Sequence, residues 1–166
     1  AWLEYIGQSH PKEIELGLER VKSVLDKLKL KPLARKTVVV SGTNGKGSTI
    51  AMMAACLSGL GYRVGTYTSP HITNYNERVA INGCFVSDDA LMRAFSQIEE
   101  ARGATPLTYF EFGTLAAFCC FSEQTLDVTL LEVGLGGRLD AVNVIDADLA
   151  IICSVALDHV DWLGSD

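Results

Sequence analysis

Apolar residues recur along this chain with two different periods, and their alternation predicts an α/β protein. Between residues 14 and 28 they fall every three or four positions, the spacing of a helix with one buried face. Residues 37–41 form a short, continuous and β-branched run, which is typical of a strand buried on both faces. Residues 46–60 then predict a helix that ends at Gly61. The second and third segments together form a first βα unit.

The remainder of the chain continues this alternation. Asn82 and Gly83 predict a hairpin turn because both residues tolerate positive φ, and Ser87 is a predicted helix cap. The expected elements are, in chain order, a strand over 63–68, hairpin strands over 78–81 and 84–86, helices over 87–101 and 109–121, and strands over 127–133 and 148–155. Strands that alternate with helices imply a doubly wound, mostly parallel α/β sheet in one domain over residues 1–166.

A glycine-rich turn joins the first strand to the next helix and predicts a phosphate site. Residues 41–49 read Ser-Gly-Thr-Asn-Gly-Lys-Gly-Ser-Thr, so small residues let backbone N–H groups approach an anion while Lys46 supplies a full charge. The spacing is shorter than that of the usual P-loop, which places four residues between the first glycine and the Gly-Lys pair. An ordinary loop is the alternative. The strand, turn and helix context favours binding of a nucleoside triphosphate.

Composition limits which binding partners and which cellular location are expected. The formal charge of −6 argues against a general nucleic-acid surface. No apolar stretch is long enough to span a bilayer, so neither membrane binding nor export is expected and a cytoplasmic, monomeric protein is predicted. The five cysteines contain no C-x-x-C pair and are expected to be reduced core residues: Cys56, Cys84, Cys119, Cys120 and Cys153.

Four polar groups are expected at the carboxyl ends of the strands, where open parallel sheets bind ligands. They are the 42–48 turn, Ser69 to His71, Glu132, and Asp158 with His159. Glu132 ends an apolar run, a position from which an acid can hold magnesium, although a structural ion pair is the alternative. Ser69 could be a cap and His159 a surface side chain. The glycine-rich segment 134–140 that follows Glu132 is either a ligand contact or a plain turn.

Several motifs together resemble one family. The chain is similar to the amino-terminal ATPase domain of bacterial bifunctional dihydrofolate synthase/folylpolyglutamate synthase, in the Mur ligase superfamily. The resemblance covers essentially all 166 residues in order. The motifs that carry it lie at residues 15–20, 41–49, 67–71, 76–78, 107–111, 131–140 and 156–159.

The resemblance implies ATP-dependent ligation of L-glutamate to dihydropteroate or to reduced folates, through an acyl phosphate. Lys46, Glu132 and His159 are the implied catalytic residues, and Ser69, Glu132 and His159 are the implied ligands of Mg²⁺. The implied ATP cradle comprises Thr43, Asn44, Gly45, Lys46, Gly47 and Ser48. The implied dihydropteroate pocket comprises Thr108, Phe110, Asp140 and Ala141. The loop over residues 71–78 is expected to close over that substrate.

The chain departs from the family pattern in two ways. It stops before the family's modified lysine and before the carboxy-terminal domain with the glutamate site, so the 166 residues are expected to be a truncated ATPase domain without ligase activity of their own. Val142 replaces a threonine that relatives often carry, which bears on the pterin contacts. A P-loop kinase or regulatory NTPase, and a non-catalytic adaptor with the same fold, are the competing hypotheses.

Overall fold

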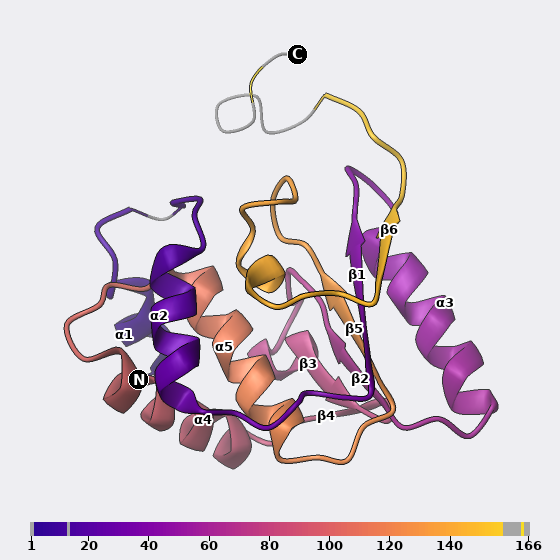
Figure 1. Cartoon of the computed structure of the whole chain (residues 1–166), viewed down its shortest axis with the longest axis horizontal. Helices are drawn as coiled ribbons and strands as arrows, with labels where there is room; N and C mark the ends of the chain where they lie inside the picture. Colours follow the sequence, from indigo (N-terminus) through magenta and orange to yellow (C-terminus); the bar gives the residue numbers. More distant parts are fainter. Residues whose placement is uncertain (1, 13, 158–163, 165–166) are drawn as a thin grey trace.

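One twisted sheet with helices on both faces forms the framework of the molecule (Figure 1). The structure is a computed structural model and describes residues 2–12, 14–157 and 164. The six strands lie in the order β4-β3-β2-β5-β1-β6. Their bounds are β1 Lys36–Ser41, β2 Val64–Tyr67, β3 Val79–Ile81, β4 Cys84–Phe85, β5 Val128–Glu132 and β6 Leu149–Ile152. Strands β2, β5, β1 and β6 are parallel, whereas β3 and β4 join antiparallel. This confirms the predicted doubly wound, mostly parallel sheet.

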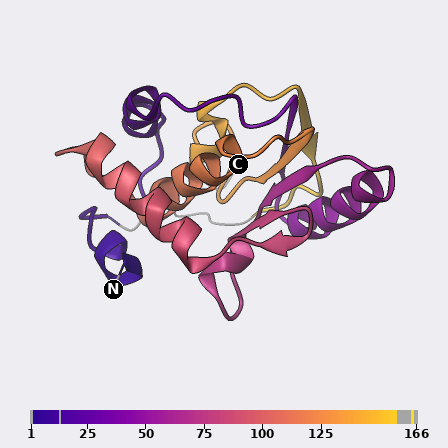
Figure 2. The same ribbon diagram turned by 90° about the horizontal axis from the view of Figure 1, so that it is seen from below.

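Helices cover the two faces of the sheet unequally. Among the described helices, α3 alone packs on one face, and α2, α4 and α5 lie on the other, an arrangement that Figure 2 shows from below. The helix bounds are α1 Trp2–Gly7, α2 Glu19–Leu28, α3 Lys46–Gly59, α4 Asp88–Arg102 and α5 Tyr109–Ser122, with 3-10 turns at Tyr75–Arg78 and Ala141–Val144.

The alternating side chains of β1 divide the hydrophobic core in two. Val38 and Val40 point to the α3 face, where they join Ile50 in a small cluster. Val39 points to the opposite face, into a larger cluster that contains most of α5. Phe112 of that helix is fully buried, and burial of such a side chain contributes roughly 1.5–3 kcal/mol to folding. Helix α5 is therefore the central element of the core, as its continuous apolar sequence predicts.

Local signals in the sequence formed as predicted at one helix start, one hairpin and one helix end. The hydroxyl of Ser87 accepts a hydrogen bond from the backbone N–H of Ala90 at the start of α4. Asn82 and Gly83 both have positive φ, 51° and 79°, in the turn between β3 and β4. Helix α3 ends beside Gly61, whose φ is 85°.

Three predictions about the elements were wrong. The helix predicted over 14–28 begins only at Glu19, because Gly17 has a φ of 140° that no helix allows and its N–H bonds to the carbonyl of Leu139. The last strand, expected over 148–155, ends at Ile152, since the following residues leave the sheet to contact the phosphate turn. The prediction also omitted α1.

The cysteine prediction holds for only part of the set. Cys119 and Cys120 are buried in α5, and burial raises the pKa of these thiols to about 12 and about 11. Cys56 and Cys84 are exposed instead, because α3 has a solvent-facing side and β4 lies at the sheet edge. All five thiols are free.

Candidate functional site

The glycine-rich turn 42–45 connects the end of β1 to the first residue of α3. Gly45 caps the helix with a φ of 89°, a left-handed conformation that favours glycine. Lys46 follows at the helix start, and its Nζ donates to the carbonyl oxygens of Gly42, at 2.7 Å, and Thr43, at 3.2 Å. The ammonium is therefore folded back over the turn, which places a positive charge beside the positive end of a helix.

The segment after β6 holds this turn in place. The N–H of Thr43 donates to the carbonyl of Ser154 at 2.7 Å. The Thr43 hydroxyl bonds to both the carbonyl and the N–H of Ala156, and the Ser154 hydroxyl donates to the carbonyl of Asn44. Gly42 must lack a side chain here, because a Cβ would lie 2.9 Å from the Ser154 oxygen. The Thr43 side chain thus anchors the turn.

Glu132 and Ser69 meet beside the turn, as their positions at strand ends predict. The N–H of Ser69 donates to Oε2 of Glu132 at 2.9 Å. A Cβ on Gly47 would lie within 4 Å of both carboxylate oxygens, so the first turn of α3 faces the same acid. Burial raises the pKa of Glu132, whereas the Ser69 N–H, the Lys46 charge and the Gly47 N–H act to lower it. Glu132 is 5% exposed.

These groups suit a hard divalent cation. A carboxylate and a serine hydroxyl are oxygen donors of the kind that Mg²⁺ prefers. The positive end of α3 beside them favours the phosphate anion that would accompany the ion. His159 and its neighbour Asp158 fall outside the described residues. Within the described part of the chain, no group of three or more His, Cys, Asp or Glu side chains forms a metal cluster. The geometry brings together Lys46, Ser69 and Glu132.

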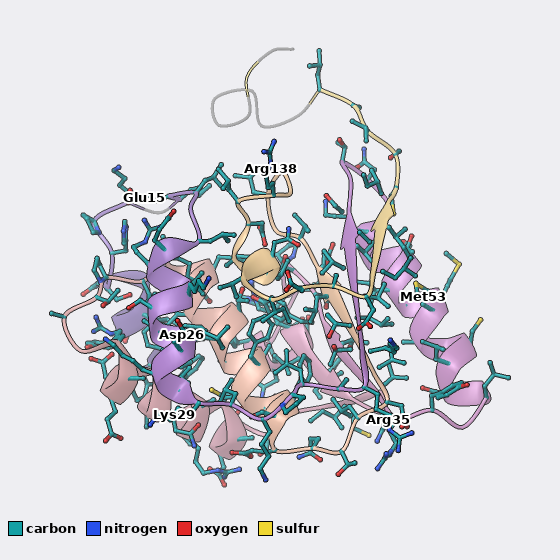
Figure 3. The ribbon with its side chains drawn as sticks, viewed as in Figure 1. Glu15, Asp26, Lys29, Arg35, Met53 and Arg138 are labelled. Carbon is teal, nitrogen blue, oxygen red and sulfur yellow. The ribbon has the colours of Figure 1, made fainter. Side chains whose placement is uncertain are left out.

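A cavity of about 350 Å³ lies on the other side of Ser69. All four residues predicted for the substrate pocket line it: Thr108, Phe110, Asp140 and Ala141. Another part of its wall is formed by residues 14–17, which have no regular secondary structure although a helix was predicted there. Figure 3 shows Glu15 from this segment and Arg138 from the glycine-rich loop at the same end of the molecule, whereas Lys29 and Arg35 lie at the other end.

Two of the predicted pocket residues are fixed by capping bonds. The Asp140 carboxylate accepts from the N–H groups of Gly134, Leu135 and Val142. Burial nevertheless dominates and raises its pKa to about 6. The Thr108 hydroxyl caps α5 by accepting from the N–H of Glu111. Both residues therefore shape the pocket through the backbone that they hold.

A second cavity, of about 370 Å³, lies over the phosphate turn. It is lined by Lys46, the turn itself and the 134–137 loop. Gly134 and Leu135 line both cavities, so the two share a wall. A Cβ on Gly134 would lie 2.6 Å from the Phe110 ring, so only glycine allows this close contact between loop and helix.

The structure adds residues that the sequence analysis did not select. Arg78 lines the first cavity and is 8% exposed. Arg20 reaches from α2 to Glu111 at 2.9 Å and to the carbonyl of Glu15 at 2.8 Å, which fixes the 14–17 wall. The motifs at 15–20 and 76–78 contain both arginines, but no periodicity in the sequence shows that these side chains turn inward.

Known proteins resemble this chain along its whole length. It is 50% identical to dihydrofolate synthase/folylpolyglutamate synthase of Escherichia coli over 166 residues, which is 100% of this chain and 39% of the relative. It is 39% identical to the protein of the same name from Bacillus subtilis over 159 residues, covering 92% of this chain and 37% of the relative. The chain thus spans about two fifths of the length of these curated relatives. No protein-family model matches it.

Solved structures agree with the sequence comparison. Escherichia coli FolC in complex with DHPP and ADP has a TM-score of 0.97 at 50% identity, covering 99% of this chain and 40% of that one. The Yersinia pestis bifunctional folylpolyglutamate synthase/dihydrofolate synthase, complexed with AMPPNP and a Mn ion, has a TM-score of 0.93 at 54% identity, with 99% and 40% covered. In sequence and in fold, the chain corresponds to the amino-terminal part of the dihydrofolate synthase/folylpolyglutamate synthase family.

Proposed function

We propose that these 166 residues are the ATP-binding domain of a ligase that joins L-glutamate to dihydropteroate or a folate. One observation carries the proposal: the phosphate-turn cavity and the cavity of Thr108 and Phe110 share a wall at Gly134 and Leu135. A triphosphate in the first cavity and a carboxylic acid in the second would meet beside Ser69. Phosphoryl transfer requires this alignment more than it requires a nucleophilic side chain.

The proposed reaction has two steps. A carboxylate oxygen of the pterin substrate attacks the γ-phosphorus of ATP, and ADP leaves. The amine of L-glutamate then attacks the acyl carbon and loses a proton, the amide bond forms, and inorganic phosphate leaves with the electron pair of the broken C–O bond and takes up one proton. Lys46 is proposed to neutralise charge on the β- and γ-phosphates, since its ammonium already lies over the turn.

Magnesium would neutralise charge on the phosphate oxygens when it is bound. Ser69 and Glu132 are its proposed ligands among the described residues, and the proposed role of His159 rests on the family resemblance. The N–H of Ser69 holds Glu132 in position through the 2.9 Å hydrogen bond. Asn44, Gly45, Gly47 and Ser48 complete the proposed phosphate cradle, with Thr43 anchoring it.

The cavity beside Phe110 is the proposed site of the pterin. An aromatic face and a buried acid suit a flat heterocycle that has both apolar faces and hydrogen-bonding edges. The proposal extends to a cytoplasmic, monomeric protein without nucleic-acid partners, in line with the free cysteines and the acidic composition. No helix within the described residues is long and apolar enough to cross a membrane.

A turnover assay on a full-length protein that contains these residues tests the proposal. ADP release is expected only when dihydropteroate and L-glutamate are both present with MgATP. The 166-residue chain assayed alone is expected to release no ADP above background, because its relatives are about two and a half times as long. Comparable ATP hydrolysis without either substrate would instead support the regulatory NTPase hypothesis.

A further inference from the structure

The ionisable side chains that line the pterin-site cavity differ in the partners that the described residues give them. Glu15, Glu111 and Asp140 line it, and each is held by other groups of the protein. Glu15 lies 3.1 Å from Nε2 of His10, Glu111 lies 2.9 Å from Arg20, and Asp140 accepts three backbone N–H bonds. The acids of the wall are thus already satisfied by the protein.

Arg78 is the cation of this wall, and it has no such acid. Arg78 is only 8% exposed. Among the residues that the structure describes, no carboxylate lies within ion-pairing distance of its guanidinium. Its Nε donates to Nδ1 of His71 at 2.9 Å. The guanidinium lies 5.3 Å and 5.6 Å from the ring centres of Tyr75 and Tyr109.

The backbone fixes Arg78 next to the reacting end of the cavity. Its carbonyl accepts a hydrogen bond from Thr68 at 2.9 Å, and Thr68 directly precedes Ser69. Ser69 in turn donates to Glu132 beside the phosphate turn. These contacts place Arg78 at the Ser69 end of the cavity, where Glu132 approaches the phosphate turn.

A buried arginine without a counterion is costly unless another anion completes it. From this arrangement we infer that Arg78 binds the carboxylate of the ligand that occupies the cavity and holds it at the Ser69 end. The planar guanidinium matches a carboxylate in shape and in charge. This inference rests on the proposed function, because it takes the ligand to be dihydropteroate. Arg78 would thus recognise the carboxylate that is to be phosphorylated.

A purely structural Arg78 is the competing interpretation. Its contacts with two tyrosine rings, with His71 and with the Tyr67 hydroxyl would then be its whole role, since cation–π contacts contribute to stability without any ligand. The two interpretations differ in one respect. Only a ligand-binding arginine distinguishes a carboxylate from an uncharged group of the same shape.

The first experiment needs no variant. Calorimetry on a full-length protein containing these residues compares dihydropteroate with its carboxamide, in which the carboxylate is replaced by a neutral amide of similar size. The acid is expected to bind at least about tenfold more tightly, the usual range for a hydrogen bond to a charged group. Equal affinities would overturn the inference while leaving the proposed function intact.

The second experiment assigns the preference to Arg78. Arg78→Met should bind the acid at least about tenfold more weakly and the amide unchanged, and Arg78→Lys should recover part of the difference. Arg102→Met is the matched control, because Arg102 is also largely buried and also lies over a tyrosine ring, but pairs with Glu99 away from the cavity.

The remaining outcomes are distinguishable. Equal weakening of acid and amide binding by Arg78→Met would show a structural role and overturn the inference. If that variant does not fold, Arg78→Lys must still reduce the acid-to-amide ratio, and an unchanged ratio would contradict the inference. Failure of the unmutated protein to bind dihydropteroate at all would overturn the proposed function, and this inference with it.

Discussion

The two glycine-rich loops at the carboxyl ends of β1 and β5 resemble each other in sequence, but their charged residues differ in position. Lys46 of the first faces a cavity, whereas Asp140 of the second is buried against its own loop. In the phosphate turn, Lys46 lies at the surface of a cavity, and the turn is held from outside by Ser154 and Ala156. In the 134–140 loop, Asp140 is 3% exposed and holds the loop from inside through its own backbone bonds. Glycine content therefore does not show which loop presents its charge to a ligand. The hydrogen-bond partners of the charged side chain show whether it is available to a ligand.

Removal of the Lys46 charge tests the phosphate turn and should have the largest effect of the four changes on its measured property. Lys46→Ala is expected to reduce ligation by a full-length protein on the order of 10²- to 10³-fold, the range for loss of one stabilising donor. The melting temperature should change little, because the hydrogen bonds of this side chain to described residues are with carbonyls of its own turn. Lys22→Ala on the exposed side of α2 is the control. Unchanged turnover in Lys46→Ala would contradict the view that the phosphate turn, unlike the 134–140 loop, offers its charge to a ligand.

Replacement of Asp140 tests the internally held loop by its pH dependence. The pKa of Asp140 is about 6 in the folded protein, above its ordinary value of 3.8, so the folded state binds the proton more tightly. Stability from this group is therefore present at low pH and is lost as the pH rises from about 4 to about 6, by roughly 3 kcal/mol.

Urea unfolding of the chain at pH 4, 5, 6 and 7 measures this loss. The stability of the unmutated chain relative to Asp140→Asn should fall over that window, since the variant cannot ionise there. Asp26→Asn, on the exposed side of α2, controls for the general effect of losing an acid. A difference that stays flat with pH would mean that the Asp140 carboxylate is not desolvated by its loop.

Glu132 lies between the two loops. We expect its charge, like that of Lys46, to act on a ligand rather than to hold a loop in place. Loss of even a supporting outer group reduces metal affinity about 10- to 100-fold, so Glu132→Gln is expected to weaken Mg²⁺ binding in the nucleotide complex at least about tenfold. Titration calorimetry with Mg²⁺ and AMPPNP on a full-length protein measures this effect. The same titration on Asp140→Asn should match the unmutated protein; equal losses in both variants would place the two acids in one role.

The smallest expected effect concerns the wall between the cavities. Gly134→Ala places a Cβ 2.6 Å from the Phe110 ring, which must shift into the cavity. A loss of about 1 kcal/mol in unfolding free energy is expected, the low end for overpacking, because the ring tip has room to move. Dihydropteroate affinity should fall while nucleotide affinity is kept. Gly59→Ala, with no atom within 4 Å of the added Cβ, is the control.

The sequence predicted the elements whose signals are local. Burial on both faces identified β1, the Asn82-Gly83 pair identified the hairpin, and the unbroken apolar run identified α5. The prediction failed where a long-range contact overrides periodicity. The 14–17 segment has helical spacing, but its bonds to Leu139 and Arg20 hold it as a cavity wall.

The candidate site was predictable to the same extent. Lys46, Ser69 and Glu132 could be placed together because the ends of neighbouring parallel strands meet at one edge. Arg78 could not, since its inward direction depends on packing against Tyr75 and Tyr109, two rings that come from different segments. The role of Thr43 in anchoring the turn also depends on a residue 113 positions away, Ala156.

The hydrogen bonds between the phosphate turn and residues 154–156 have a mechanical consequence. Thr43, Asn44 and the stretch after β6 are fastened at several points, so neither can be displaced without straining the other. Residues 154–156 and the phosphate turn are therefore expected to move together. Under the proposed function, a shift of this stretch would therefore be expected to change the affinity of the turn for nucleotide.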